Sequence, residues 1–262
     1  MKKMLPSALE HVEEIVGRGG RSFAIFLDYD GTLTPIVSDP EKAWLSDSMR
    51  QTLRELAAKA PVAILSGRDL KDVRQRVGID AIIYAGSHGF DIAGPGGLRK
   101  QVGTEFLPGL DTAEKKLRDA LDGIPGVLIE RKRFSIAAHY RNLKAQDDLP
   151  KVKRAIGKVA AQLPELRVIE GKKVYEIQPN IDWDKGRALM WLASSLRLDR
   201  EERFPIYIGD DATDEDAFRA LKQRGAAIIV SEQSQPSIAR YMLRNPEEVE
   251  VFLRTLTVRI MA

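Results

Sequence analysis

An unbroken apolar run that ends in two carboxylates constrains this chain more than any other feature. Phe23–Leu27 is apolar throughout, and Asp28 and Asp30 follow it directly. A run of this kind between polar segments predicts a strand buried on both faces of a parallel sheet. In open α/β sheets the ligand binds beyond the carboxyl ends of the strands, so both acids fall where a site is expected.

Two interpretations of this acidic pair are open from the residues alone. A side-chain period of two would start Asp28 and Asp30 on the same side of the chain, and Gly31 allows a sharp turn after them. Like charges this close repel unless a cation or a proton lies between them. The pair is therefore either a turn with two solvated acids or a magnesium site with one carboxylate free to attack.

Helix and strand patterns alternate on both sides of this segment. Apolar strand patterns recur at 62–65, 81–85, 205–209 and 226–230, and helical patterns at 6–16, 46–56, 70–77, 184–196 and 246–256. This βαβαβ alternation with short connections predicts an α/β fold with a doubly wound parallel sheet of Rossmann type.

The pattern changes in the middle of the chain. A hairpin is expected over 90–102, and a helix-strand-strand order then occurs twice, with helices at 111–121 and 147–163 and strands at 127–130, 134–140, 167–170 and 174–177. An antiparallel sheet backed by two helices cannot continue a parallel sheet. We therefore predict a core formed by 1–107 and 179–262, with an inserted α+β domain at 108–178.

Composition excludes several classes of function. The net charge of +3 comes from 41 basic and 38 acidic residues, so the composition does not indicate a basic surface for nucleic acid. A pI near 9.0 nevertheless suits a small anionic substrate. The absence of cysteine excludes disulfides and thiolate chemistry. No apolar run is long enough to cross a membrane, and Met1–Pro6 is followed by no signal-peptide pattern, so we expect a cytoplasmic location.

Polar groups gather at the ends of the predicted core strands. They are Asp28 with Asp30, Ser66, Lys185, and Asp210 with Asp211 and Asp214. Each alone could be a helix cap, a solvated turn or a surface charge. Together they supply what phosphoryl transfer needs: an attacking carboxylate, oxygen ligands for a hard cation, a lysine and a hydroxyl for phosphoryl oxygens, and a second acid for proton transfer.

Four segments, FLDYDGTL (26–33), LSGR (65–68), DKG (184–186) and GDDATDEDAF (209–218), together resemble the motifs of the haloacid dehalogenase-like phosphatases. The resemblance implies that Asp28 is the nucleophile and Asp30 the general acid/base. It also implies that Ser66, Gly67 and Lys185 bind the phosphoryl group. The implied cofactor is Mg²⁺, held by the Asp28 side chain, the Asp30 main-chain carbonyl and Asp210, with Asp211 and Asp214 as supporting or ligating acids. The inserted domain resembles the αββαββ cap of these enzymes.

Nearly the full length resembles the trehalose-6-phosphate phosphatase family. The signatures are YAGSHGFDI (84–92), Glu130-x-Lys132 with His139-Tyr140-Arg141, and Gly171-Lys172-x-Val174-x-Glu176. The implied reaction is hydrolysis of trehalose 6-phosphate through an aspartyl phosphate, the last step of trehalose biosynthesis. We expect the substrate's sugars to be bound by Glu130, Lys132 and Glu176, helped by Arg68, His88, His139 and Arg141. Gln178 departs from the family pattern, in which an arginine is expected.

Two alternatives differ in substrate or in class. The same chemistry would serve sucrose phosphate, mannosyl-phosphoglycerate or another sugar phosphate. A non-catalytic module that stores an aspartyl phosphate is the other alternative, but it would have no use for the acid/base Asp30 or for a cap. No nucleic-acid or membrane partner is expected. A stand-alone monomer is the working expectation.

Overall fold

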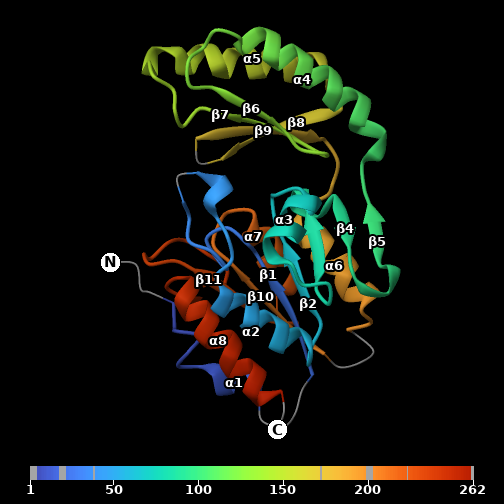
Figure 1. The fold of residues 1–262 in the computed structure, drawn as a ribbon, viewed down its shortest axis with the longest axis vertical. Helices are drawn as coiled ribbons and strands as arrows, with labels where there is room; N and C mark the ends of the chain where they lie inside the picture. The colour runs from blue at the N-terminus through green and yellow to red at the C-terminus, as the bar shows by residue number, and fades with distance from the viewer. Residues whose placement is uncertain are drawn as a thin grey trace. The chain divides into compact units, whose positions relative to one another are not determined.

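A computed structural model describes residues 5–17, 22–37, 39–171, 173–198, 203–222 and 224–260 (Figure 1). The chain divides into two compact units. The first consists of Met1–Lys100 and Trp183–Ala262, and the second of Gln101–Asp182, so the second is an insertion in the sequence of the first. No helix in the described ranges combines the length and the apolar character needed to span a bilayer.

The first unit is built on a sheet of eight described strands in the order β12-β11-β10-β1-β2-β3-β4-β5. The strands are β1 (Phe23–Leu27), β2 (Val62–Leu65), β3 (Ile83–Gly86), β4 (Asp91–Ala93), β5 (Arg99–Gln101), β10 (Phe204–Gly209), β11 (Ala226–Val230) and β12 (Tyr241–Leu243). Neighbours from β12 to β3 are parallel, and β4 is antiparallel to β3. The predicted doubly wound parallel sheet is confirmed.

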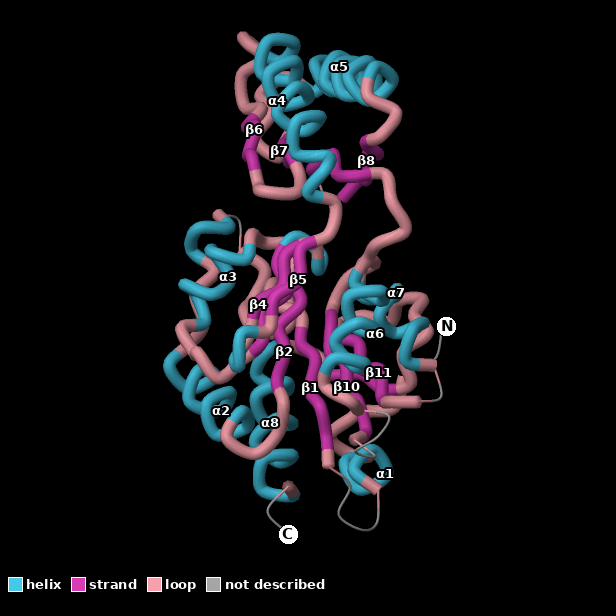
Figure 2. Tube along the Cα trace, turned by 90° about the vertical axis from the view of Figure 1, so that its right-hand side faces the viewer, coloured by secondary structure: helices cyan, strands magenta, loops and turns pink. Residues whose placement is uncertain are grey.

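Helices cover both faces of this sheet. They are α1 (Val12–Val16), α2 (Asp47–Ala57), α3 (Leu70–Val77), α6 (Lys185–Ser195), α7 (Asp214–Leu221) and α8 (Pro246–Arg259). Side chains of β1 alternate between the two faces: Phe23, Ile25 and Leu27 share a buried cluster with α1, α2, α3 and α8, whereas Ala24 and Phe26 pack with α6 and α7. Figure 2 shows the strands running between these two layers of helices.

Residues 6–8 differ from the prediction of a helix that begins at Pro6. Ala8 N donates to Met242 O at 2.8 Å, and Met242 N donates to Pro6 O at 2.9 Å. This parallel pairing with β12, a strand that the sequence pattern did not predict, uses the backbone groups that a helix would need. Helix α1 therefore begins only at Val12.

The second unit has the order α4 (Leu107–Leu121), β6 (Leu128–Arg131), β7 (Ile136–His139), α5 (Leu149–Gln162), β8 (Leu166–Gly171) and β9 (Val174–Pro179). Its strands form an antiparallel sheet in the order β6-β7-β9-β8. Ile136, Ala138, Tyr175 and Ile177 pack with both helices on one face. The predicted αββαββ arrangement is confirmed.

The predicted domain limits lie inside elements of the second unit. Helix α4 begins at Leu107, before residue 108, because Pro108 stands in its first turn, where a missing N–H costs no helical hydrogen bond. Strand β9 continues through Gln178 to Pro179. The compact units divide instead near residues 100 and 182.

Candidate active site

The site begins where strand β1 ends. Asp28 N donates to Ile208 O at 2.9 Å, which continues the pairing of β1 with β10 for one residue beyond Leu27. The chain then turns, with Leu33 N donating to Tyr29 O and Gly31 in a left-handed conformation at φ 87°. A Cβ atom at Gly31 would overlap the Asp210 carboxylate, so only glycine allows these two segments to approach this closely.

Lys185 joins the carboxylates of two loops. It opens α6, whose first turn is capped by Asp184 through a 2.8 Å bond from Arg187 N. Its Nζ donates to Asp28 Oδ1 at 2.6 Å and to Asp214 Oδ1 at 2.8 Å, and its side chain is only 3% exposed. Burial alone would lower the pKa of Lys185, but the charges of Asp214 and Asp28 raise it well above its ordinary value. Lys185 is therefore a permanent cation here.

Asp214 organises the loop that follows β10. Its Oδ1 accepts from Lys185 and from Tyr207 Oη at 2.7 Å, and its Oδ2 accepts from Asp210 N at 3.0 Å and Asp211 N at 3.1 Å. Four donors occupy the lone-pair positions of this fully buried carboxylate. Tyr207 was not selected from the sequence, because a tyrosine within an apolar strand pattern is typical of core packing.

Carboxylates of Asp28, Asp210 and Asp214 form the acidic cluster in the part of the chain that the structure describes. One oxygen from each lies within 4.8 Å of the others. Burial raises the pKa of Asp28 above its ordinary value, Lys185 opposes this, and Asp214 and Asp210 add to the rise. A divalent cation among these oxygens would favour the ionised form of Asp28, so the donor set fits a hard cation such as Mg²⁺.

Asp211 has a different environment from these three acids. Its Oδ1 accepts from Thr213 N at 2.6 Å and from Thr213 Oγ1 at 2.9 Å, at the start of α7. Burial would raise the pKa of Asp211, but Lys185 and the Thr213 hydrogen bonds lower it. The carboxylate of Asp211 is not part of the described acidic cluster.

Ser66 and Gly67 follow strand β2 at the same edge of the sheet. Ser66 N donates to Ala85 O at 2.9 Å, and its hydroxyl accepts from Arg68 N at 3.1 Å, which leaves the O–H proton available to a phosphoryl oxygen. A Cβ atom at Gly67 would lie 2.8 Å from the His88 ring. His88 and Ser87 both have positive φ, at 55° and 49°, an uncommon conformation that places the imidazole against the Gly67 backbone.

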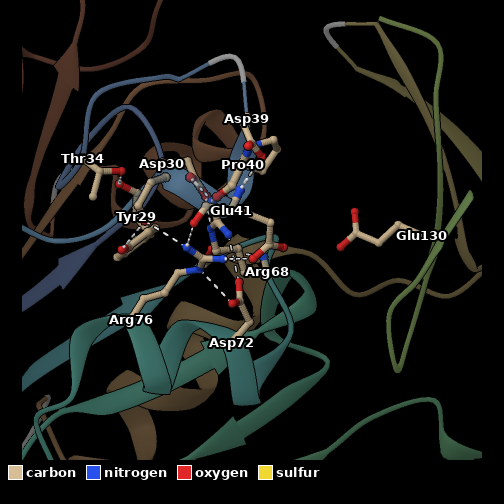
Figure 3. Close-up of polar contacts among 12 residues, drawn as sticks. Tyr29, Asp30, Thr34, Asp39, Pro40, Glu41, Arg68, Asp72, Arg76 and Glu130 are labelled. Carbon is tan, nitrogen blue, oxygen red and sulfur yellow. Dashed lines mark hydrogen bonds and ion pairs between the residues drawn. The ribbon is translucent and has the colours of Figure 1, made fainter. Parts of the chain in front are cut away.

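Asp30 and Arg68 form a two-bond ion pair (Figure 3). Arg68 Nε donates to Asp30 Oδ2 and Nη2 donates to Asp30 Oδ1, both at 2.7 Å. The two acids of the first motif thus have different partners: Lys185 holds Asp28, and Arg68 holds Asp30. The expectation that Asp28 and Asp30 start on the same side of an extended chain does not apply, because β1 ends at Leu27 and the chain turns from Tyr29 onward.

Four of the predicted sugar-binding residues share one face of the antiparallel sheet in the second unit. Ala137 of β7 is paired with Glu130 of β6 on one side and with Glu176 of β9 on the other. His139 of β7 is paired with Val174 of β9. This face is the one opposite to α4 and α5, because the intervening residues Ile136 and Ala138 pack against the helices. Lys132 follows β6 directly.

These side chains pair with each other. His139 Nε2 lies 2.8 Å from Glu130 Oε2, and Lys132 Nζ donates to Glu176 Oε1 at 3.2 Å. Ser135, which the sequence analysis did not select, donates its hydroxyl to the same Glu176 oxygen at 2.5 Å. Arg141 lies beyond the end of β7. Position 172 of the sequence signature lies outside the described residues.

The structure therefore brings the predicted site residues together in two sets. One set lies at the carboxyl edge of the parallel sheet in the first unit and consists of Asp28, Asp30, Ser66, Gly67, Arg68, His88, Lys185, Asp210, Asp211 and Asp214. The other belongs to the antiparallel sheet of the second unit and its adjoining turns: Glu130, Lys132, His139, Arg141 and Glu176.

Comparisons with known proteins identify the family. A family model described as trehalose-phosphatase matches residues 26–247. Probable trehalose-phosphate phosphatase E of Arabidopsis thaliana is 43% identical over 96% of this chain and 75% of its own length. A trehalose-phosphate phosphatase of Mycobacterium tuberculosis is 42% identical over 95% of this chain, which spans only 64% of that relative.

Solved structures agree on the fold. A trehalose-6-phosphate phosphatase related protein superposes with a TM-score of 0.77 at 27% identity, over 90% of this chain and 97% of its own. A haloacid dehalogenase-like hydrolase from Bacteroides thetaiotaomicron, at 16% identity, bears on the fold alone, with a TM-score of 0.64 over 92% of this chain and 100% of its own. The match to the family model over most of the chain is decisive, and this chain belongs to the trehalose-phosphatase family.

Proposed function

We propose that this chain hydrolyses trehalose 6-phosphate to trehalose and phosphate, the last step of trehalose biosynthesis, and that Asp28 forms a transient aspartyl phosphate. Membership of the trehalose-phosphatase family supports the substrate. The observation that carries the chemistry is the position of Asp28. It is a buried carboxylate at the end of a parallel strand, held through one oxygen by a permanent cation.

In the first step a carboxylate oxygen of Asp28 attacks phosphorus. Lys185 binds Oδ1, so Oδ2 is the oxygen available for attack. As the new O–P bond forms, the bond between phosphorus and the sugar oxygen breaks, and Asp30 gives its proton to that oxygen to complete the trehalose hydroxyl. Lys185 and the Ser66 hydroxyl stabilise the charge on the remaining phosphoryl oxygens.

In the second step water attacks phosphorus. Asp30, now a carboxylate, takes a proton from that water while the bond between phosphorus and the Asp28 oxygen breaks. Phosphate leaves, Asp28 is again a free carboxylate and Asp30 is protonated, so the cycle closes without a change in any residue.

The acidic cluster supports Mg²⁺ as the cofactor. Asp28 and Asp210 would hold the ion with the Asp30 main-chain carbonyl, and the ion would neutralise charge on the phosphate and on Asp28. Asp214 is better suited to a supporting role, because four hydrogen bonds already occupy its oxygens. Asp211 accepts from Thr213 and would likewise shape the loop.

We further propose that the sheet face with Glu130, Lys132 and Glu176 binds the sugar rings, with His139, Arg141 and His88 as additional contacts. Carboxylates accept from sugar hydroxyls and the ammonium donates to sugar oxygens. A site built from such groups rejects a substrate that lacks the matching hydroxyls, because its polar groups would be left unsatisfied. A cytoplasmic location and a monomeric state are also part of this proposal.

Phosphate release from a panel of sugar phosphates tests the proposed function. Trehalose 6-phosphate, sucrose 6-phosphate, mannosyl-phosphoglycerate and glucose 6-phosphate would be compared at equal concentration, with Mg²⁺ and with EDTA. We expect trehalose 6-phosphate to have the highest kcat/KM and EDTA to abolish turnover. A higher kcat/KM for another sugar phosphate would refute the substrate, and a stable phosphorylated protein without turnover would refute catalysis.

A further inference from the structure

The contacts of Arg68 leave little of its guanidinium for a substrate. Its Nε and one N–H of Nη2 donate to Asp30 (Figure 3). The other N–H of Nη2 donates to Pro40 O at 2.9 Å, and Nη1 donates to Asp72 Oδ2 at 2.9 Å. Four of the five donors are thus engaged. The guanidinium also lies 5.4 Å from the centre of the Tyr29 ring, and the side chain is 11% exposed. Arg68 is therefore fixed on the protein itself.

Asp72 is the centre of a chain of charges along α3. Its Oδ2 accepts from Arg68 and its Oδ1 accepts from Arg76 Nε at 2.8 Å, so residues 68, 72 and 76 are joined at four-residue intervals. Burial would raise the pKa of Asp72, but hydrogen bonds from Arg76 and Arg68 lower it below its ordinary value. Asp72 is thus an anion with a cation on each oxygen.

Arg76 anchors the far end of this chain. It is 1% exposed, its Nη1 donates to Glu41 O at 3.0 Å and Ala43 O at 3.3 Å, and its Nη2 binds Glu41 Oε2 at 2.9 Å. The Trp44 ring lies over it at 4.9 Å. A buried arginine with this many partners has little freedom to move, because leaving its carboxylate partners would strand an uncompensated charge. Asp30 is connected through Arg68 and Asp72 to this fixed point.

From this chain of contacts we propose that Asp72 and Arg76 are positioning residues for Asp30. They hold Arg68 in the orientation in which both of its donors meet the two oxygens of the Asp30 carboxylate. Release of one of those two hydrogen bonds frees an oxygen of Asp30, which takes up a proton and gives it to the leaving group, while the other hydrogen bond keeps the side chain in place. Arg68 is then part of the proton-transfer apparatus and not a sugar ligand. This inference rests on the proposed phosphoryl transfer by Asp28 and Asp30.

Asp72→Asn tests the proposal with two aryl phosphates of similar shape. An asparagine keeps the size of the side chain but can accept from only one of the two arginines and turns N–H groups toward the other. Phenolate needs a proton from Asp30 to leave, whereas p-nitrophenolate leaves readily without one. The measured quantity is kcat/KM, which reports the step in which the aryl group departs, and neither substrate carries a sugar.

We expect Asp72→Asn to lower kcat/KM for phenyl phosphate about 10-fold and that for p-nitrophenyl phosphate by less than about 2-fold, since a misplaced acid costs most where protonation is needed. Asp80→Asn is the matched control. It removes an exposed partner of Arg74 at 3.7 Å just beyond the same helix and should change neither value. Asp72→Glu retains the charge and should recover most of the loss.

Equal losses on both aryl phosphates in a folded protein, or no loss on either, would overturn the proposal. Should Asp72→Asn fail to fold, Arg68→Lys tests the same contact, because a lysine cannot bind both Asp30 oxygens and Asp72 together; the same selective loss is expected. Poor hydrolysis of trehalose 6-phosphate by the unmodified chain would count against the proposed substrate alone. Failure to hydrolyse trehalose 6-phosphate and both aryl phosphates would overturn both proposals.

Discussion

The carboxyl edge of the parallel sheet and the open face of the antiparallel sheet both present acids and cations, but they hold them differently. At the parallel edge, Asp214 accepts four hydrogen bonds and is completely buried. On the antiparallel face, Glu130 is about half exposed and pairs with His139, a neighbour on the same sheet.

The difference follows from what parallel and antiparallel sheets expose. A doubly wound sheet buries both faces, so its polar groups emerge only at strand ends, where loops from several strands meet and can fix one another. An antiparallel sheet with helices on one side leaves its other face available along its whole length. The first arrangement suits chemistry that needs one geometry. The second would suit the proposed sugar recognition, because paired side chains could exchange their partners for sugar hydroxyls.

The largest effect should come from Asp28→Asn, which tests whether the parallel edge alone carries the chemistry. An amide cannot form the aspartyl phosphate, so kcat for trehalose 6-phosphate and for p-nitrophenyl phosphate should both fall by about 10⁴-fold or more. The substitution preserves the shape of the side chain, and Tm should change little. Steady-state phosphate release and thermal denaturation measure the two quantities. A loss confined to trehalose 6-phosphate would contradict the assignment.

Lys185→Met should show that the same edge is also a centre of stability. Without the cation, Asp28 and Asp214 are left as buried neighbours of like charge, which should cost about 3 kcal/mol, or roughly 10 °C in Tm for a unit of this size. Added Mg²⁺ should raise the Tm of this variant more than that of the unmodified chain. Lys151→Met, at an exposed ion pair in the second unit, is the control. Equal Tm values for the two variants would refute the role of Lys185.

Glu176→Ala should separate recognition from chemistry. Loss of the carboxylate that binds Lys132 and Ser135 should raise KM for trehalose 6-phosphate by about 10- to 100-fold. Hydrolysis of p-nitrophenyl phosphate, which has no sugar, should change by less than about 2-fold. Glu170→Ala on the adjacent strand removes a carboxylate paired with Tyr175 and serves as the control. Equal losses on both substrates would defeat the assignment of this face to the sugar.

The smallest effect concerns the pair of Glu130 and His139. The hydrogen bond from His139 is the main cause that lowers the pKa of Glu130 below its ordinary value of 4.5. A lowered pKa in the folded state contributes stability that is present above pH 4.5 and is lost as the pH falls through the lowered value. His139→Ala should therefore reduce Tm slightly at pH 7, by the few tenths of a kcal/mol typical of an exposed pair, and by less at pH 3. A Tm difference that grows in acid would contradict this.

Local sequence pattern was sufficient to predict the strands whose ends form the carboxyl edge of the parallel sheet. A strand buried on both faces is an apolar run, so β1, β2 and β10 could be recognised in the sequence. The polar residues that follow each run could be recognised with them. Strand β12 was missed because it has only three residues, and the segment that pairs with it on the side away from β11, residues 6–8, lies at the other end of the chain. The helix predicted at 111–121 begins earlier, at Leu107, because a proline is tolerated in the first turn of a helix.

Contacts between distant side chains could not be predicted. Asp30 and Arg68 are 38 residues apart, and no periodicity indicates that one binds the other. The regular spacing of Arg68, Asp72 and Arg76 was a usable signal, because residues four apart meet on a helix. Their connection to the loop at Glu41 and Ala43 depends on how α3 packs in three dimensions.

The most direct test of the account is a burst experiment with Asp30→Asn and p-nitrophenyl phosphate. The aryl group can leave without an acid, but water attack lacks its base, so the aspartyl phosphate should accumulate. We predict a rapid release of p-nitrophenolate equal to the protein concentration, followed by slow turnover, with one phosphoryl group on the peptide that contains Asp28 after acid quenching. Turnover without a burst, or a phosphoryl group on any other peptide, would contradict nucleophilic attack by Asp28.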